Sequence, residues 1–139
     1  MSTKVFINLP VADLPKSIRF FELLGYRINP QFTDETAACV VISAEIYTML
    51  LTHDKWRQFT PKPIPDATKM NEVIVALSCD ERGEVDRICD QAAASGASKF
   101  GDPQDMGFIY LRSFTDLDGH VWEYCWMDPA TGEQGPAKK

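Results

Sequence analysis

Residues 114–124 read Phe114-Thr115-Asp116-Leu117-Asp118-Gly119-His120-Val121-Trp122-Glu123-Tyr124, and this stretch decides the fold. Asp118-Gly119 between two apolar runs is a strong signal for a β-hairpin, because glycine tolerates the positive φ that tight turns require. The runs on either side, 108–112 and 121–126, are rich in aromatic and β-branched residues, as strands are. Glu123 interrupts the second run. A carboxylate there either has a partner or a ligand, or it lies on a strand face open to solvent.

The same order of elements occurs twice along the chain. In the first half, alternating apolar residues predict a strand over 5–11, Asp13 is a suitable helix N-cap, and Gly25 is a suitable helix end. Three further strands are expected there, at 26–32, 38–42 and 46–52. In the second half, a strand over 73–78 precedes a helix that opens at Asp80, and the hairpin follows. The pattern therefore predicts two copies of a β-α-β-β-β unit.

We expect an α+β fold in which two modules, at about 4–53 and 72–127, form one curved mixed sheet around a concave pocket. Together they make a single domain over 1–127. The segment that joins them, 54–71, should lack regular structure because it contains three closely spaced prolines, Pro61, Pro63 and Pro65. This proline-rich loop acts either as a connector or as a lid over the pocket.

The composition is that of an ordinary soluble globular protein, with 45% hydrophobic and 24% charged residues. The net charge of −6 argues against nucleic acid as a partner, because binding to phosphates needs a basic face. No apolar stretch reaches the length of a membrane span and no secretory signal is evident, so we expect a cytoplasmic protein without membrane contact. The tail, 128–139, is expected to be flexible. The cysteines show no CxxC spacing and should be reduced thiols: Cys39, Cys79, Cys89 and Cys125.

Residue parity along the strands predicts which side chains face the helices. We expect the larger apolar set, such as Leu9, Leu77 and Trp122, to lie beneath the helices. The opposite parity then lines the concave face. Its candidate ligand-binding residues are Phe6, Asn8, Thr48, Leu50, Thr52, Ile74, Tyr110, Arg112 and Glu123. This set suits a small-molecule pocket, and it also fits a packed core with a few satisfied polar groups.

Arg112 and Glu123 lie on the two arms of one predicted hairpin and share this face. We expect the two side chains to form an ion pair whose remaining hydrogen-bonding capacity faces the pocket. The alternative is that Arg112 reaches solvent while Glu123 accepts a hydrogen bond from a backbone N–H. The two histidines, His53 and His120, show no Ser-His-Asp or Cys-His signature.

Two local patterns point to a known family. Residues 11–25 read Val-Ala-Asp-Leu-Pro-Lys-Ser-Ile-Arg-Phe-Phe-Glu-Leu-Leu-Gly, and residues 116–123 read Asp-Leu-Asp-Gly-His-Val-Trp-Glu. With the paired units, they resemble the vicinal oxygen chelate superfamily, which contains glyoxalase I, bleomycin resistance proteins, fosfomycin resistance enzymes and extradiol dioxygenases. The resemblance covers roughly residues 4–127 and implies a glyoxalase-like fold, but this fold hosts many activities.

The resemblance also implies where a metal centre would lie, with one ligand on each of several strands. Glu123 matches the last ligand, whereas the other positions correspond to Phe6, Leu50 and Ile74. These three apolar side chains have no lone pair to donate, so we expect no metal and no other cofactor. The alternative is a divalent metal bound in a shifted register that brings in Asn8, Glu72 or His53.

Three functions are compatible with this resemblance. The first is a metal-free protein that binds a small apolar or aromatic molecule in its sheet pocket, like the bleomycin resistance proteins. The second is a glyoxalase-like lyase, isomerase or dioxygenase that uses Glu123 as catalytic acid or base, with or without a divalent metal. The third is a structural or regulatory homodimer with a vestigial cavity. A homodimer is expected in each case, since two-unit members of the superfamily commonly pair.

Overall fold

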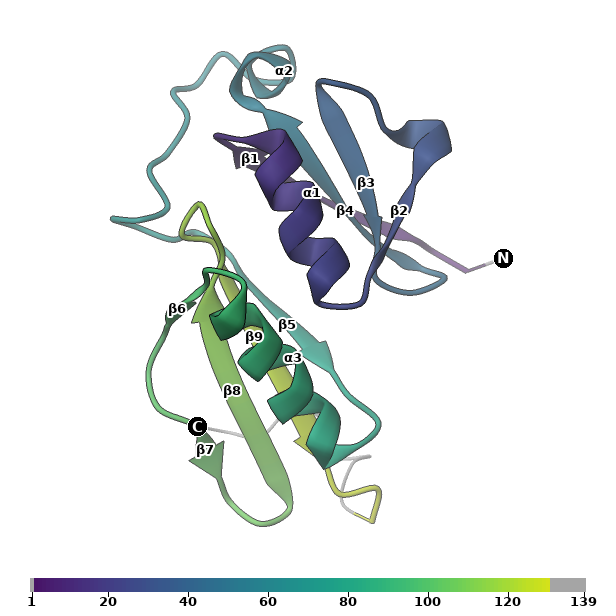
Figure 1. Cartoon of the computed structure of the whole chain (residues 1–139), viewed down its shortest axis with the longest axis vertical. Helices are drawn as coiled ribbons and strands as arrows, with labels where there is room; N and C mark the ends of the chain where they lie inside the picture. Colours follow the sequence, from purple (N-terminus) through teal and green to yellow (C-terminus); the bar gives the residue numbers. More distant parts are fainter. Residues whose placement is uncertain (1, 131–139) are drawn as a thin grey trace. The chain divides into compact units, whose positions relative to one another are not determined.

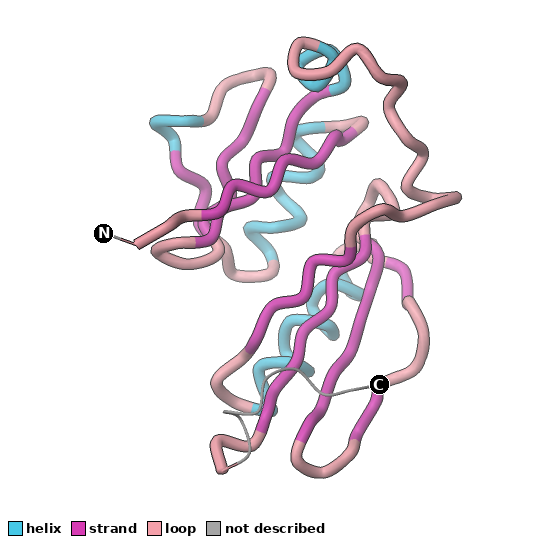
Figure 2. The backbone as a smooth tube through the Cα atoms, turned by 180° about the vertical axis from the view of Figure 1, so that it is seen from behind, coloured by secondary structure: helices cyan, strands magenta, loops and turns pink. Residues whose placement is uncertain are grey.

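The computed structural model describes residues 2–130 and divides the chain into two compact units, Met1–Asp66 and Ala67–Lys139 (Figures 1 and 2). Each unit combines one mixed β-sheet with one long helix on one of its faces. In each unit, taken by itself, the long helix covers one face of the sheet and leaves the other face without this helix (Figures 1 and 2). We call this face the open face of each sheet.

Unit 1 contains a four-stranded sheet in the order β1-β4-β3-β2, with β1 parallel to β4 and the other pairs antiparallel. Its elements are β1 (Val5–Val11), α1 (Leu14–Leu23), β2 (Arg27–Asn29), the 3-10 helix η1 (Pro30–Phe32), β3 (Ala37–Val41), β4 (Ile46–Thr52) and α2 (His53–Arg57).

Helix α1 begins where the sequence predicts it. The Asp13 side chain accepts a hydrogen bond from the Lys16 N–H at 3.1 Å, and Pro15 occupies the first turn, where a missing N–H costs nothing. Phe20 and Phe21 are buried, and the helix contacts β3 and β4. One apolar stripe therefore holds α1 on the sheet.

Unit 2 contains a sheet in the order β5-β9-β8-β6, and β7 also pairs with β8. Strand β5 is parallel to β9, whereas β8 is antiparallel to β9, β6 and β7. Its elements are β5 (Ile74–Ser78), α3 (Arg82–Ala94), β6 (Ser98–Lys99), β7 (Gln104–Asp105), β8 (Ile109–Thr115) and β9 (Val121–Met127). Helix α3 packs on β8 and β9 through a stripe that contains Val85, Ile88 and Ala92.

The turn between β8 and β9 is organised by Asp116, which is 6% exposed. One of its carboxylate oxygens accepts hydrogen bonds from the N–H groups of Asp118 and His120, both at 3.0 Å, and the other accepts one from Trp122 Nε1 at 2.9 Å. Gly119 has a φ of 93°, and a side chain there would lie 2.7 Å from the backbone of Ala67. The turn at residues 116–119 therefore shapes the hairpin and also contacts residues 67–68 at the start of unit 2.

The α+β class and the paired β-α-β-β-β modules are confirmed, with three differences in detail. The strands form two separately hydrogen-bonded sheets, one for each module. The proline-rich loop contains the end of α2, because Thr52 caps that helix and the first of the three prolines, Pro61, comes only after it. The predicted strand over 26–32 ends at Asn29, because Pro30 starts η1.

Two further expectations concern the whole chain. No helix among residues 2–130 is long and apolar enough to cross a membrane. Residues 131–139 of the predicted flexible tail lie outside the described residues, whereas the Asp128 N–H bonds to the Phe108 carbonyl at 2.8 Å.

Candidate functional site

The open face of unit 1 differs from the one predicted by parity. Ile7 is paired with Thr48 and Leu9 with Leu50, so these residues share the face that α1 covers. Thr48 and Leu50 are each 0% exposed, and their expected place on the opposite face was wrong. The reason is that Leu50 and Leu51 are both buried, which hides the alternation of β4 when the strand is read alone.

Thr52 is paired with Val11 and has the parity of Thr48 and Leu50, so its expected place on the open face was also wrong. Its hydroxyl accepts a hydrogen bond from the Lys55 N–H at 3.2 Å and so caps α2. The short helix that follows brings Trp56 close to the end of the open face.

The side chains that do share the open face of unit 1 alternate with the buried set. They include Phe6 and Asn8 on β1 and Tyr47, Met49 and Leu51 on β4. Phe6 and Tyr47 stack with ring centroids 4.9 Å apart and an interplanar angle of 11°. The Asn8 amide donates a hydrogen bond to the Phe6 carbonyl at 3.1 Å, which holds this side chain against its own strand.

A hollow of about 250 Å³ lies at the far end of this face. It is lined by Asn8, Leu51, Trp56, Phe59 and Thr60. The Phe59 side chain is 67% exposed, and the Lys55 ammonium lies 5.7 Å from the centroid of its ring. Apolar walls with one amide and one hydroxyl are the usual make-up of a site for a small apolar ligand.

Sequence reasoning placed Phe6 and Asn8 here but did not assign Tyr47, Leu51, Trp56, Phe59 and Thr60. The signal for two of them was present, because Trp56 and Phe59 are aromatic residues in a segment otherwise dominated by polar residues and proline. Tyr47 and Leu51 were missed because the parity of β4 was set one residue out of phase with β1.

The open face of unit 2 contains Glu123 at its centre. Glu123 lies between Ala76 of β5 and Ser113 of β8, and its side chain is partly buried. Ile74, another predicted site residue, lies on the same face and is 56% exposed. Among the residues of β5, β8 and β9, Glu123 is the carboxylate on this open face.

Tyr110 and Arg112 do not face Glu123, so the expected ion pair was wrong. Arg112 is paired with Tyr124 across the hairpin, and this parity belongs to the face that α3 covers. Arg112 Nη1 donates to Asp86 at 2.8 Å and to Asp90 at 2.9 Å, and the Tyr110 hydroxyl donates to Asp86 at 2.6 Å. Two carboxylates on α3 therefore take the role that we had given to Glu123.

These contacts shift the pKa values of the groups that form them. The pKa of Asp86 is lowered, mainly by the hydrogen bond from Tyr110 and then by the hydrogen bond from Arg112, although burial opposes the shift. Burial alone would lower the pKa of Arg112, but the hydrogen bonds to Asp86 and Asp90 outweigh it and raise this pKa. These hydrogen bonds and ion pairs tie α3 to β8.

Comparisons with known proteins show which proteins share this fold. The bleomycin resistance protein-like N-terminal family matches residues 3–43. A hypothetical protein from S. aureus is 27% identical to the chain, with a TM-score of 0.75 over 91% of this chain and 95% of the other. A glyoxalase/bleomycin resistance protein/dioxygenase family enzyme from Burkholderia phytofirmans PsJN is 14% identical, with a TM-score of 0.74 over 91% of this chain and 99% of the other. Residues 3–43 are therefore similar to a bleomycin resistance protein-like family, and the chain has the fold of proteins named glyoxalase/bleomycin resistance protein/dioxygenase.

A further solved structure shares this fold. The fosfomycin resistance protein FosX from Mesorhizobium loti is 14% identical, with a TM-score of 0.68 over 94% of this chain and 96% of the other. A search of curated protein sequences finds no match to the chain. The fold is therefore established, whereas the ligand and any reaction have to be argued from the residues themselves.

The residues at the superfamily's metal positions do not fit a divalent ion. Phe6 and Ile74 lie on open faces without a donor atom, and Leu50 is buried on the helix side. Glu123 supplies the carboxylate of this set, but divalent ions need several oxygen, nitrogen or sulfur ligands. No group of three or more His, Cys, Asp or Glu side chains that could hold a metal is found among residues 2–130.

Proposed function

We propose that this chain is a member of the vicinal oxygen chelate superfamily and binds a small, planar, mainly apolar molecule on the open face of unit 1. The observation that carries the proposal is the hollow of about 250 Å³ beside Trp56 and Phe59. Aromatic walls offer a planar ligand a stacking partner, and such contacts add about 0.5–1.5 kcal/mol beyond the area that they bury.

The polar groups around the hollow support a ligand with few charges. The Asn8 amide and the Thr60 hydroxyl are the polar side chains of the lining, and both can act as donor or acceptor. The stacked pair of Phe6 and Tyr47 extends the aromatic surface along the same face. A flat molecule that reaches along the sheet can therefore remain in contact with aromatic rings.

The proposal includes the absence of a metal centre, because the superfamily's ligand positions hold Phe6, Leu50 and Ile74. We expect elemental analysis of protein purified without chelator to find no stoichiometric zinc, nickel, manganese or iron. A near-stoichiometric metal that is lost in a Glu123→Ala variant would contradict this part of the proposal.

Binding can be tested through the fluorescence of Trp56. Titration with 2-naphthol should quench part of the tryptophan emission saturably, with one site per chain. A Trp56→Phe variant should lose most of this signal, because the other two tryptophans, Trp122 and Trp126, do not line the hollow. A Phe59→Ala variant should raise the dissociation constant roughly threefold to tenfold, through the loss of one aromatic contact.

Phe32→Ala is the matched control for Phe59→Ala. Phe32 is also a highly exposed phenylalanine of unit 1, at 60%, but it belongs to η1 and does not line the hollow. Its replacement should leave 2-naphthol binding unchanged. Equal weakening by both replacements, or no saturable binding at all, would refute the proposed site.

One observation favours a second candidate function, acid–base catalysis by Glu123. Its carboxylate lies in the middle of the open face of unit 2, next to the small side chains of Ala76 and Ser113, which leave room for a substrate. Deuterium exchange at a carbon next to a carbonyl group would reveal such chemistry. Exchange that the protein accelerates and that Glu123→Gln abolishes would favour an enzyme over a binding protein.

A further inference from the structure

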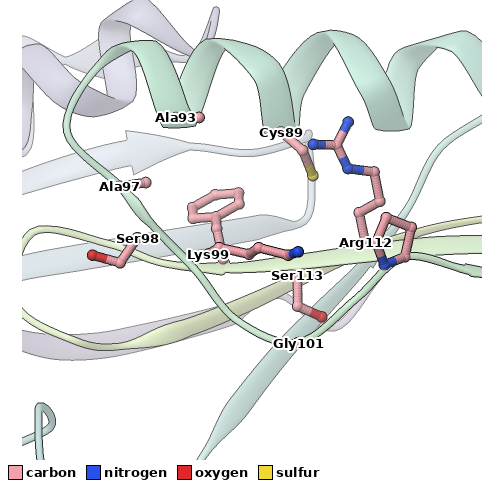
Figure 3. Close-up of a pocket in the computed structure, with 10 residues that line it drawn as sticks. Cys89, Ala93, Ala97, Ser98, Lys99, Gly101, Arg112 and Ser113 are labelled. Atoms are coloured by element: carbon pink, nitrogen blue, oxygen red, sulfur yellow. The ribbon is translucent and has the colours of Figure 1, made fainter.

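Unit 2 contains a second hollow, of about 180 Å³, between α3, the segment 97–103 and strand β8 (Figure 3). It lies on the helix side of the sheet edge and shares no lining residue with the hollow beside Trp56. We propose that this hollow binds a small monocarboxylic acid with a short apolar chain. Three hydrogen-bond donors at one end and apolar side chains at the other carry the proposal.

The first donor is a backbone N–H that the sheet leaves unpaired. Strand β8 pairs with β6 at Phe114 and Thr115 and with β7 at Tyr110 and Leu111, which leaves a gap at Ser113. The Asp116 N–H bonds to the His120 carbonyl and the Asp128 N–H to the Phe108 carbonyl, so even-numbered positions of this hairpin are its hydrogen-bonded pairs.

Ser113, an odd-numbered position, therefore directs its backbone N–H to the outer edge, where it lines the hollow. Among residues 2–130, the Ser113 N–H donates no hydrogen bond to the segment that spans the gap. A sheet edge that lacks one partner residue presents a donor in a fixed direction, which suits an oxygen atom of a ligand.

The second donor is the guanidinium group of Arg112. Its Nη1 atom donates to both Asp86 and Asp90, which leaves three of its five N–H groups, on Nε and Nη2, without a partner among the described residues. The side chain is 23% exposed, and two carboxylates fix its position. A pre-positioned guanidinium with unused donors is well suited to a carboxylate.

The third donor is the ammonium group of Lys99. Figure 3 shows its nitrogen at the same end of the hollow as the guanidinium group of Arg112. Lys99 pairs with Asp102 at 2.8 Å, but the Asp102 side chain is 87% exposed, and such exposed pairs contribute about 0–1 kcal/mol. A ligand carboxylate can therefore replace Asp102 at little cost.

The opposite end of the hollow is apolar. Ala93 and Ala97 lie there in Figure 3, and Phe114 also lines the hollow. Cys89 completes the wall as a neutral thiol, because burial raises its pKa to about 11. A volume of about 180 Å³ equals roughly six water molecules, which corresponds to an acid with about four or five carbon atoms.

The local charges favour a monoanion over a dianion. Two cations, Arg112 and Lys99, face three carboxylates, those of Asp86, Asp90 and Asp102. A monocarboxylate that displaces the Asp102 side chain from Lys99 adds one negative charge, whereas a phosphate dianion adds nearly two and is repelled more strongly. Phosphate also has no apolar part to fill the end beside the alanines.

The test is a titration of the full chain with sodium butyrate at pH 7 and constant ionic strength, monitored by ¹H–¹⁵N correlation NMR for amides and ¹H–¹³C correlation NMR for methyl groups. The Ser113 amide and the methyl groups of Ala93 and Ala97 should shift together and saturate with one dissociation constant. The dissociation constants for 1-butanol and for phosphate, measured in the same way, should be at least tenfold higher than the one for butyrate. Butanol or phosphate binding as tightly as butyrate would overturn the assigned ligand class.

Two variants locate the site without disturbing the cluster on α3. Lys99→Met should raise the dissociation constant for butyrate about fivefold, and Ala97→Leu should fill the apolar end and abolish saturation. Lys16→Met, which removes an exposed lysine in unit 1, should leave the constant unchanged. Butyrate shifts that are absent in the unmodified chain, or that all three variants retain, would overturn the proposal.

Discussion

Gly119, the last residue of the stretch 116–119, tolerates no side chain. Its φ of 93° favours glycine, and a Cβ atom there would lie 2.7 Å from the carbonyl carbon and oxygen of Ala67 and from the nitrogen of Thr68. We predict that Gly119→Ala lowers the free energy of unfolding by at least about 2 kcal/mol, since strain and the backbone contact act together. Urea denaturation followed by circular dichroism measures this loss.

Gly83 is the control for this prediction. It lies in α3, and a Cβ atom added there has no neighbour within 4 Å. Gly83→Ala should raise the free energy of unfolding by about 0.5–1 kcal/mol, because alanine has the higher helix propensity. Similar effects of the two substitutions would mean that the contact of Gly119 with residues 67–68 does not constrain the hairpin.

Thr48 is a buried hydroxyl without a hydrogen-bond partner within residues 2–130. Its side chain is 0% exposed beneath α1, where a polar group costs free energy and gains nothing. We predict that Thr48→Val raises the free energy of unfolding by about 1 kcal/mol, as thermal and urea denaturation can show. A loss of stability would indicate that the hydroxyl has a partner in solution.

Thr33 provides the opposite case for comparison. Its hydroxyl donates to the Asn29 carbonyl at 2.7 Å and accepts from the Cys39 N–H at 3.0 Å. Thr33→Val should therefore lower the free energy of unfolding by about 1–3 kcal/mol, because it leaves a backbone N–H without its partner.

Helix α3 and strand β8 depend on the carboxylate of Asp86. It accepts hydrogen bonds from Tyr110 and Arg112, and its pKa is lowered below its usual value of 3.8. A lowered pKa in the folded state contributes stability at neutral pH that is lost as the pH falls through that pKa. We predict that Asp86→Asn destabilises the chain at pH 7 and that the two proteins converge in stability below about pH 3.8.

Urea denaturation of both proteins between pH 7 and pH 3 measures this convergence. Asp116, whose pKa is raised by burial, contributes a pH dependence of opposite sign, but it is common to both proteins and cancels in the difference. Asp90→Asn is the control: this side chain is 71% exposed and accepts a single hydrogen bond from Arg112, so its loss should matter less. Equal effects would show that Asp86 is no more important than its exposed neighbour.

At the scale of elements, the sequence shows where helices and turns begin and end. It carries less information about which face of the sheet each side chain occupies. Asp13, Pro15 and the Asp118-Gly119 turn act locally, so their consequences can be read from the sequence. The facing of β4 and β8 depends on register with their neighbours. Leu50 and Leu51 are buried on opposite faces, and Arg112 finds carboxylates on α3 instead of Glu123.

At the scale of the whole molecule, the duplicated module was predictable because each copy repeats the same local signals. The candidate site was predictable only in part. Phe6 and Asn8 lie on the open face of unit 1, whereas the walls made by Trp56 and Phe59 depend on α2, which the prolines of the loop had masked. A short helix capped by one threonine is too weak a signal beside three prolines.

The last prediction concerns assembly, and it rests on exposed apolar side chains of the two open faces. Phe6 is 53% exposed and Ile74 is 56% exposed, each next to another exposed apolar residue, Val5 and Val73, and contiguous exposed apolar surface marks a candidate interface. We expect a homodimer, which sedimentation equilibrium at micromolar concentration would detect as twice the chain mass of 15.6 kDa. Phe6→Lys or Ile74→Lys should weaken the dimer, whereas Phe32→Lys, a substitution on η1, should not. If the unmodified chain sediments as a monomer, a second copy does not cover these side chains, and the cover has to come from the ligand or from the chain itself.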